Sequence, residues 1–379
     1  MPPRLQIIKG GILSRGIPNT ERAMLINANV TVLSDGTLLA TARAGSSKDA
    51  ADEMVELYRS SDGGQTWSEP ERPFPLAYVN GQPSSLRVAY ISETEPGRLL
   101  AVSMWIDRGT YAGKPFFDPE TEGCLPMGIY LAESTDVGHT WSDWQIVPMP
   151  EFIGPPSLTD RLVQLPDEYG TLVLSIETNK DYEDTNPWMQ RVVFFHSQDG
   201  GQTWGDPVNV GYDPTGRIFN WDQRVGMATN GDIITYDWTY DNHSQSYLNI
   251  HRRVSTDGGY TFTPAEDLGF ADQPSHPAIF ADGTTVLAWV DRYGTQSIRA
   301  RIAPGIDSAF APESEVVIYD HQQAANNVAT TGEMLVDMGR WTFGLPFCEA
   351  LPNGDVLVLY YAGDSTFLDI RWAILSIQP

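Results

Sequence analysis

One eight-residue pattern occurs four times in this chain and restricts its fold more than any other feature. The pattern is Ser-x-Asp-x-Gly-x-Thr-aromatic, and its copies begin at Ser60, Ser134, Ser197 and Ser255. In such a pattern the aspartate accepts hydrogen bonds from backbone N–H groups of a turn, the glycine supplies a positive φ, and the aromatic ring packs beneath. The repeat therefore predicts equivalent β-hairpins, and we expect its aspartates to be structural rather than catalytic.

A second repeat consists of an apolar strand, a turn containing glycine, and another apolar strand. The glycines of its six copies are Gly36, Gly97, Gly170, Gly231, Gly283 and Gly354. Six hairpins with a further pair of strands each predict an all-β fold, a six-bladed β-propeller with four-stranded antiparallel blades, because such blades bury their faces only against one another. The last strand, 370–375, lacks an outer partner, so we expect residues 5–12 to supply it. Residues 1–379 are thus expected to form a single propeller domain.

Charge and cysteine content narrow the classes of partner. Lys and Arg number 24 against 49 Asp and Glu, and the resulting net charge of −25 disfavours nucleic acid and anionic membranes as partners. The two cysteines, Cys124 and Cys348, are too few for a disulfide framework. The N-terminus has no apolar signal-peptide region and the chain has no long apolar run, so we expect a cytoplasmic protein unless a signal peptide has been removed.

The aspartate motifs on a six-fold repeat resemble the Asp boxes of sialidases and their relatives, and the resemblance covers nearly the whole chain. It implies a carbohydrate substrate. In sialidases an arginine and, six residues later, an aspartate that acts as general acid/base precede the first Asp box. Arg43 and Asp49 have this spacing. The resemblance thus implies that Asp49 is catalytic and that Arg43 binds the substrate.

Three other features of sialidases are missing. Their first inner strand opens with Arg-Ile-Pro, whereas the corresponding residues here are Ile26 to Asn29. The arginine expected in the fourth blade is replaced by Trp238, and no tyrosine lies among residues 343–347, where the sialidase nucleophile is expected. Because those arginines bind the substrate carboxylate in sialidases, we do not expect an ordinary sialidase.

Alignment of the six hairpins on their glycines, with an allowance for longer turns in the second and third blades, brings six residues to one equivalent position near the mouth of the central channel. They are Asn29, Arg87, Arg161, Arg224, His276 and Phe347. We expect Arg87, Arg161 and Arg224 to bind the substrate there, unless each arginine pairs with a nearby carboxylate such as Asp160 or Asp222.

The remaining candidates are carboxylates, histidines and aromatic residues. Asp222 lies where sialidases place the glutamate that activates the nucleophile, and Glu177 is a reserve carboxylate; His276 is the histidine expected to reach the pocket, and His243 lies on a neighbouring loop. Trp221 and Trp238, together with Trp105 and Tyr361, are suited to packing against sugar rings. Neither a metal-binding cluster nor a phosphate-binding loop is visible, so we expect no metal and no cofactor.

The sequence leaves three functions open. The first is an exo-acting glycoside hydrolase with Asp49 as acid/base and Asp222 or Glu177 as the second carboxylate. The second is a polysaccharide lyase, in which Arg161 and Arg224 neutralise a uronate carboxylate while His276 or His243 removes the adjacent proton. The third is a propeller that binds sugars without catalysis, since this fold hosts many functions.

Overall fold

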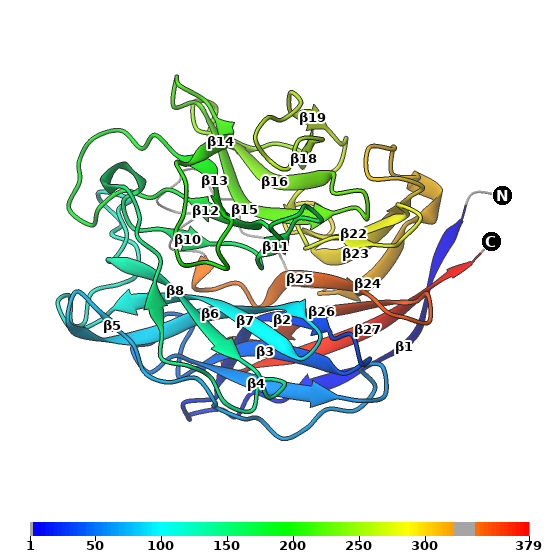
Figure 1. Cartoon of the computed structure of the whole chain (residues 1–379), viewed down its shortest axis with the longest axis horizontal. Coiled ribbons are helices and arrows are strands. Elements are labelled where there is room, and N and C mark those ends of the chain that lie inside the picture. Colours follow the sequence, from blue (N-terminus) through cyan, green and yellow to red (C-terminus); the bar gives the residue numbers. More distant parts are fainter. Residues whose placement is uncertain (1–2, 322–337, 379) are drawn as a thin grey trace.

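The computed structural model describes residues 3–321 and 338–378. Almost all of their regular structure is antiparallel β-sheet, which confirms the predicted all-β class (Figure 1). Two short 3-10 helices, η1 (Glu151–Ile153) and η2 (Pro312–Ser314), lie between strands. Among the described residues, we find no helix with the length and apolar character needed to cross a membrane.

The strands form one seven-stranded and four five-stranded sheets. The seven-stranded sheet joins strands from both ends of the chain: β1 (Arg4–Ser14), β2 (Met24–Val32), β3 (Leu38–Gly45), β4 (Met54–Ser60), β25 (Phe343–Ala350), β26 (Val356–Gly363) and β27 (Leu368–Gln378). The next sheet contains β5 (Tyr78–Val79), β6 (Gln82–Glu95), β7 (Arg98–Asp107), β8 (Met127–Ser134) and β9 (Gln145–Ile146).

The other three sheets follow in chain order. One contains β10 (Ser157–Leu158), β11 (Val163–Gln164), β12 (Leu172–Glu177), β13 (Arg191–Ser197) and β14 (Val208–Tyr212). The next contains β15 (Ile218–Met227), β16 (Ile233–Asp241), β17 (Ser246–Tyr247), β18 (His251–Ser255) and β19 (Glu266–Asp267). The last contains β20 (Gln273–Pro274), β21 (Ala278–Ile279), β22 (Thr285–Asp291), β23 (Ser297–Ala303) and β24 (Val316–Asp320).

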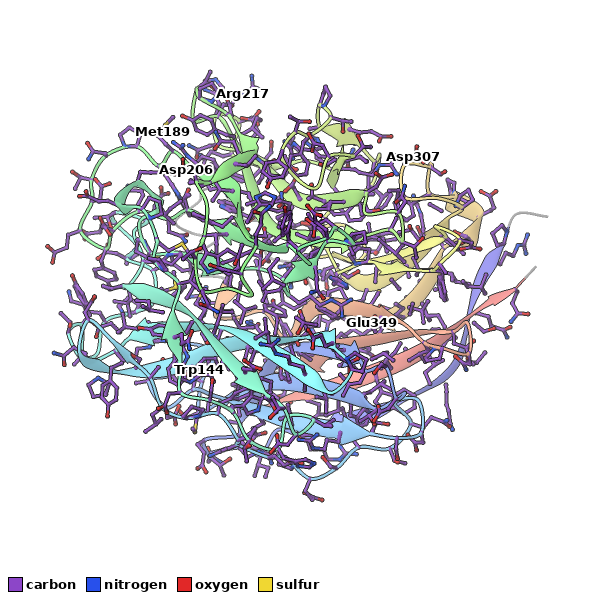
Figure 2. All side chains as sticks on the ribbon, in the orientation of Figure 1. Trp144, Met189, Asp206, Arg217, Asp307 and Glu349 are labelled. Carbon is purple, nitrogen blue, oxygen red and sulfur yellow. The ribbon has the colours of Figure 1, made fainter. Side chains whose placement is uncertain are left out.

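Each set of strands packs against the next set along the chain. β4 contacts β6, β7 contacts β10, β12 contacts β15, β16 contacts β20, and β22 contacts β25. β25 in turn contacts β2, so the contacts return to their starting point. Side chains fill the space between the ribbons (Figure 2). The sheets therefore form a ring, and the blue and red ends of the chain lie beside each other in Figure 1.

The two ends of the chain close this ring. β1 pairs antiparallel with β27, and the register runs from Leu5 opposite Ile377 to Ile12 opposite Arg371. This pairing confirms the prediction that residues 5–12 supply the outer strand. A single parallel pair, Met24 with Leu368, joins β2 to β27 and merges the first and last sets of strands into one sheet.

The central strands of the sheets are buried on both faces. Every residue of β3, β12 and β16 is buried, and β26 is buried except at its last residue. A strand in the middle of a sheet that is covered on both faces has no solvent side, so even the polar residues of β16, which alternate with apolar ones from Thr235 to Asp241, are buried. The turns between such strands carry the predicted glycines; Gly36 and Gly354 have φ values of 87° and 88°.

The four Asp boxes share one hydrogen-bonding pattern. In the first, the Asp62 carboxylate accepts hydrogen bonds from the backbone N–H and the hydroxyl of Thr66 at 2.9 and 2.7 Å, and from the Ser60 hydroxyl at 2.8 Å. The equivalent bonds recur at Asp136, Asp199 and Asp257. Partial burial alone would raise the pKa of Asp62, but these hydrogen bonds lower it to about 2. The boxes are therefore structural turns, as predicted.

Asp62→Ala should lower the free energy of unfolding by about 1–2 kcal/mol at neutral pH, because a solvent-screened set of charge-assisted hydrogen bonds is lost. Urea titrations measure the effect. Since the pKa of Asp62 is lowered from 3.8 to about 2, the difference from the wild type should shrink as the pH falls through this window. Glu69→Ala, in an exposed position of the same turn, is the control. Equal losses in both variants would contradict the prediction.

Candidate active site

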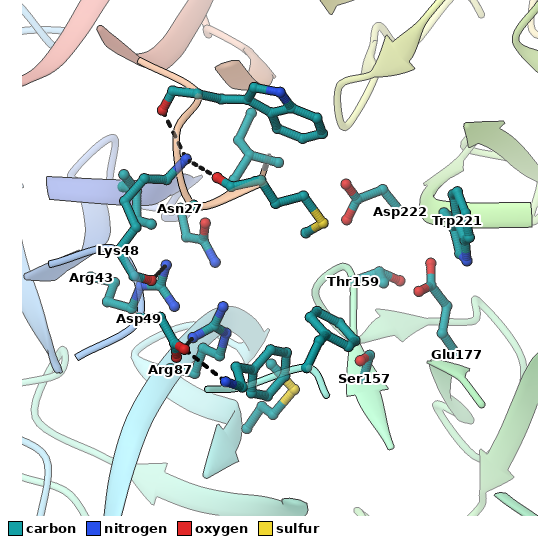
Figure 3. A pocket seen from close by; sticks show the side chains of 18 of the residues that line it. Asn27, Arg43, Lys48, Asp49, Arg87, Ser157, Thr159, Glu177, Trp221 and Asp222 are labelled. Carbon is teal, nitrogen blue, oxygen red and sulfur yellow. Dashed lines mark hydrogen bonds and ion pairs between the residues drawn. The ribbon is translucent and has the colours of Figure 1, made fainter. Parts of the chain in front are cut away.

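A cavity of about 370 Å³ opens where the inner strands begin. Residues of β2, β3, β6, β15 and β25 line it, together with loop residues 115–119 and 338–341. Figure 3 shows its charged residues on two opposite sides: Arg43, Lys48, Asp49 and Arg87 on one, and Glu177 and Asp222 on the other. We call these sides the basic wall and the acidic wall.

Backbone bulges in three inner strands aim side chains into this cavity. The strand register shifts between Ile26 and Asn29, between Trp221 and Arg224, and between Gly344 and Phe347. The residues after Ile26, Trp221 and Gly344 have positive φ values: Asn27 (54°), Asp222 (46°) and Leu345 (46°). All three line the cavity. Bulges commonly re-aim side chains at functional sites, and a positive φ is unfavourable for residues other than glycine. Three equivalent positions that line the cavity therefore have an unfavourable backbone conformation.

The acidic wall holds Glu177, at the end of β12, and Asp222, in the bulge of β15. Burial, and after it the Asp222 carboxylate, raise the pKa of Glu177 well above its usual range. The backbone N–H of Gln223 donates to Glu177 at 3.2 Å, and the side-chain amide of Gln273 donates to Asp222. Two neighbouring carboxyl groups of which one retains its proton are suited to acid–base chemistry.

The basic wall is organised around a buried carboxylate, Glu53. Arg43, Arg87 and Arg108 donate to it at 3.0, 3.1 and 3.2 Å. Burial raises the pKa of Glu53, whereas the Arg87 and Arg43 guanidinium groups lower it. The net result is a pKa below the ordinary value. Glu53 itself does not line the cavity, so it positions the arginines around it.

Asp49 faces the cavity but is already engaged. Its carboxylate accepts hydrogen bonds from Arg108 at 2.7 Å and from the backbone N–H of Phe116 at 2.7 Å. Burial alone would raise the pKa of Asp49, but Arg87, Arg108 and the Phe116 N–H hold it below its ordinary value. Asp49 is therefore ionised at neutral pH, which does not favour the predicted general-acid role.

Lys48 is a residue of the basic wall that was not predicted from the sequence. Its ammonium group donates to the carbonyls of Met338 and Trp341 at 2.7 and 2.9 Å and to the Tyr361 hydroxyl at 3.2 Å. Burial, and then nearby arginine side chains, lower its pKa well below the usual range. A signal was available, because Lys48 lies inside the motif that links Arg43 to Asp49.

Aromatic side chains complete the cavity. Trp221, Trp238 and Tyr361 line it, as expected, and Trp188 and Trp341 join them from loops. Trp105 does not; it is buried beside Trp144 in the core. The loop tryptophans could not be assigned from sequence because no repeat fixes the conformation of the segments that carry them.

The six residues expected at one equivalent position do not all converge. Two register shifts in β6, at Leu86/Val88 and at Glu93/Glu95, displace Arg87 into the basic wall. Tyr90 takes the expected place instead, since its hydroxyl accepts a hydrogen bond from Arg224 at 3.3 Å and its ring stacks on Phe347. The allowance for a longer turn was therefore wrong for β6, because Tyr90 precedes Gly97 by the same interval as Asn29 precedes Gly36.

His276 and Arg161 form a buried network outside the cavity, which corrects the predicted placement of both. The Nδ1 atom of His276 donates to the Asp160 carboxylate at 2.9 Å, and Arg161 contacts its Nε2 atom at 3.0 Å. Arg161 also pairs at 2.5 Å with Glu349 of β25, labelled in Figure 2. Because both ring nitrogens are engaged, His276 has no free nitrogen to accept a proton from a substrate.

The other candidates also lie outside the main cavity. Arg224 lines a smaller cavity of about 50 Å³ beside Asp222, and it donates to the Thr159 carbonyl. Asn29 is buried and donates to Thr41 and to the Ala89 carbonyl. His243 is exposed on the loop after β16. The lyase constellation of Arg161, Arg224 and the two histidines is therefore not assembled.

A metal site is not apparent either. Among residues 3–321 and 338–378, no group of three or more histidine, cysteine, aspartate or glutamate side chains is arranged to hold a metal ion.

Comparison with known proteins agrees with this architecture. The BNR/Asp-box repeat family matches residues 58–69, which contain the first Asp box. The chain is 28% identical over 263 residues to a sialidase of Micromonospora viridifaciens, covering 66% of this chain and 36% of that protein. These similarities support the predicted resemblance to the sialidase-like superfamily. It spans only about a third of the length of this curated relative.

Solved structures extend the similarity to nearly the whole chain. A Dyadobacter fermentans protein of unknown function matches 100% of both chains with a TM-score of 0.74 and 20% identity. An intramolecular trans-sialidase of Ruminococcus gnavus matches 98% of this chain and 97% of its own with a TM-score of 0.64 and 15% identity. A Penicillium chrysogenum α-L-arabinanase matches 97% and 98% with a TM-score of 0.61 and 16% identity. At these identities the similarity concerns the fold, which is thereby implied to be a β-propeller.

Glu177→Gln should stabilise the protein, and increasingly so as the pH rises above about 4.5, the ordinary pKa of the group. The reason is that the unfolded chain releases this proton near pH 4.5 whereas the folded protein retains it, so the wild type loses stability with rising pH. The amide removes this penalty. Thermal melts between pH 4 and pH 8 measure the difference, and the exposed Glu120→Gln is the matched control. A stability difference that stays constant with pH would show that Glu177 titrates normally.

Proposed function

We propose that this sialidase-like protein is an exo-acting glycoside hydrolase that removes a terminal sugar from a glycan or oligosaccharide. The observation that carries the proposal is the raised pKa of Glu177 beside Asp222 in a cavity lined by aromatic residues. A carboxyl that keeps its proton near neutral pH can protonate a leaving oxygen, and a second carboxylate can act as nucleophile or as base toward water. Aromatic rings suit the apolar faces of sugars.

In this proposal Glu177 is the general acid and Asp222 is the nucleophile or general base. Asp49, the acid/base implied by the resemblance, instead anchors Arg108 and the Phe116 backbone as an ionised carboxylate. This assignment follows the pKa directions, because a general acid must hold a proton at the working pH.

The substrate is proposed to differ from that of an ordinary sialidase. In the stretch where sialidases carry the arginine of Arg-Ile-Pro, this chain contributes Asn27 to the cavity. In the stretch where they carry the tyrosine nucleophile, it contributes Leu345. Neither side chain can pair with a carboxylate ionically or act as a phenolic nucleophile. The structural similarity to an α-L-arabinanase supports a range of possible sugars that is broader than sialic acid.

We also propose that the ring consists of six blades in a single domain. Division of the seven-stranded sheet at the Met24–Leu368 pair gives two antiparallel sets, which with the other four sheets make six. The six positive-φ glycine turns support this division.

Glu177→Gln should lower kcat on a sugar or alkyl leaving group by about a hundredfold to ten-thousandfold, the usual contribution of general acid catalysis. The dinitrophenolate of a dinitrophenyl glycoside leaves without protonation, so kcat on that substrate should fall much less. A panel of aryl glycosides identifies the sugar first, and steady-state kinetics on matched leaving groups then compare the variants.

Asp49→Asn is the comparison variant. It should raise KM more than it lowers kcat, because it disturbs the basic wall and leaves the acid in place. A leaving-group dependence in Asp49→Asn but not in Glu177→Gln would overturn our assignment. An unsaturated uronate product would indicate a lyase, and sugar binding without any product would indicate a binding protein; either result would refute the proposed hydrolase.

A further inference from the structure

The basic wall carries more positive charge than its own carboxylates neutralise. Arg43, Arg87 and Arg108 surround two carboxylates, Glu53 and Asp49. Three guanidinium groups against two carboxylates leave one positive charge in excess, in a protein whose net charge is −25. Lys48, beside them, contacts only neutral oxygen atoms. Buried charge without a counter-charge is costly, so an anion entering this wall would be favoured.

Within this wall, Arg87 has hydrogen-bond donors to spare. One terminal nitrogen donates to Glu53 at 3.1 Å. Its other terminal nitrogen and its Nε atom have no hydrogen-bond partner in the described part of the chain. The guanidinium lies over the Phe116 ring at 4.1 Å, and 13% of the side chain is exposed. Arg87 is therefore held in position while it presents free donors, whereas the terminal nitrogens of Arg43 and the ammonium of Lys48 are already engaged.

The position of this charge restricts where a bound sugar carries its negative group. Under the proposed function, bond cleavage takes place at Glu177 and Asp222, on the opposite side of the cavity (Figure 3). A sugar whose carboxylate is attached to the anomeric carbon would present its charge next to these two carboxylates. A sugar with its anionic group on another ring carbon can direct that group toward Arg87 while its anomeric carbon faces the acidic wall.

We propose that Arg87, supported by the field of Arg43, binds an anionic group on a ring carbon of the substrate other than the anomeric one. The shared chemistry is a carboxylate or sulfate, as in a hexuronic acid or a sulfated sugar. Arginine is suited to both because its planar donors match these oxygen pairs. The inference rests on the proposed function in one respect, that the anomeric carbon of the sugar reacts at Glu177 and Asp222.

Calorimetric titration tests the anion site without requiring turnover. The ligands are the methyl glycosides of a hexuronic acid, a sulfated hexose, N-acetylneuraminic acid and a neutral hexose. We expect the uronide or the sulfated glycoside to bind best, and whichever it is identifies the anionic group. Arg87→Gln should weaken that ligand by about tenfold to a hundredfold, with partial rescue in Arg87→Lys. The exposed Arg15→Gln should bind like the wild type.

Other outcomes overturn the inference. If the neutral glycoside binds as tightly as the charged ones, or if the sialoside binds best and depends on Arg87, the anion site is wrong as proposed. Binding of a uronide that no glycoside panel shows to be hydrolysed would refute the proposed function and leave the anion site standing. Hydrolysis of a neutral glycoside without any preference for charge would refute the anion site and leave the proposed function standing.

Discussion

Each set of strands in this protein buries its faces only against the neighbouring sets, and every other feature depends on that constraint. A sheet with two apolar faces is unstable alone, so stability requires the circuit of contacts from β4 through β25 back to β2. The same circuit directs the first residues of the inner strands toward one place. The cavity is thus a product of ring packing, and its contents are set by a few bulged positions rather than by a separate binding module.

The cavity has its arginines on one side, with the ionised Asp49 among them, and Glu177 and Asp222 on the other. Glu53 gathers three arginines on one side, and burial keeps a proton on Glu177 on the other. A low local dielectric strengthens both effects, because water that would screen the arginines would also stabilise ionised Glu177. The mechanism and the substrate orientation that we propose therefore have a common physical origin, the exclusion of water by the aromatic lining.

Much of the fold follows from the sequence because its signals are local and repeated. The Asp62 turn, the Gly36 and Gly354 hairpins and the outer strand β1 each depend on a few neighbouring residues or on strand counting. Long-range packing decided the rest. An allowance for a longer turn misplaced Arg87, since the turn at Gly97 places Tyr90, not Arg87, at the equivalent position. His276 has the right position in its hairpin, but Asp160 from another sheet engages it.

The pairing of β1 with β27 has a consequence for how the molecule is made. The strand that completes the last set, β1, is synthesised before the other strands described here and has no partner until residues 368–378 emerge. Ring closure must then wait for those residues, and until that time β1 is an unpaired edge available to other chains. Because the two ends finally lie side by side, the chain can in principle be joined there and opened at another turn. In a circular permutant cut at the Gly231 turn, β27 and β1 would be neighbours in the chain and would be synthesised one after the other.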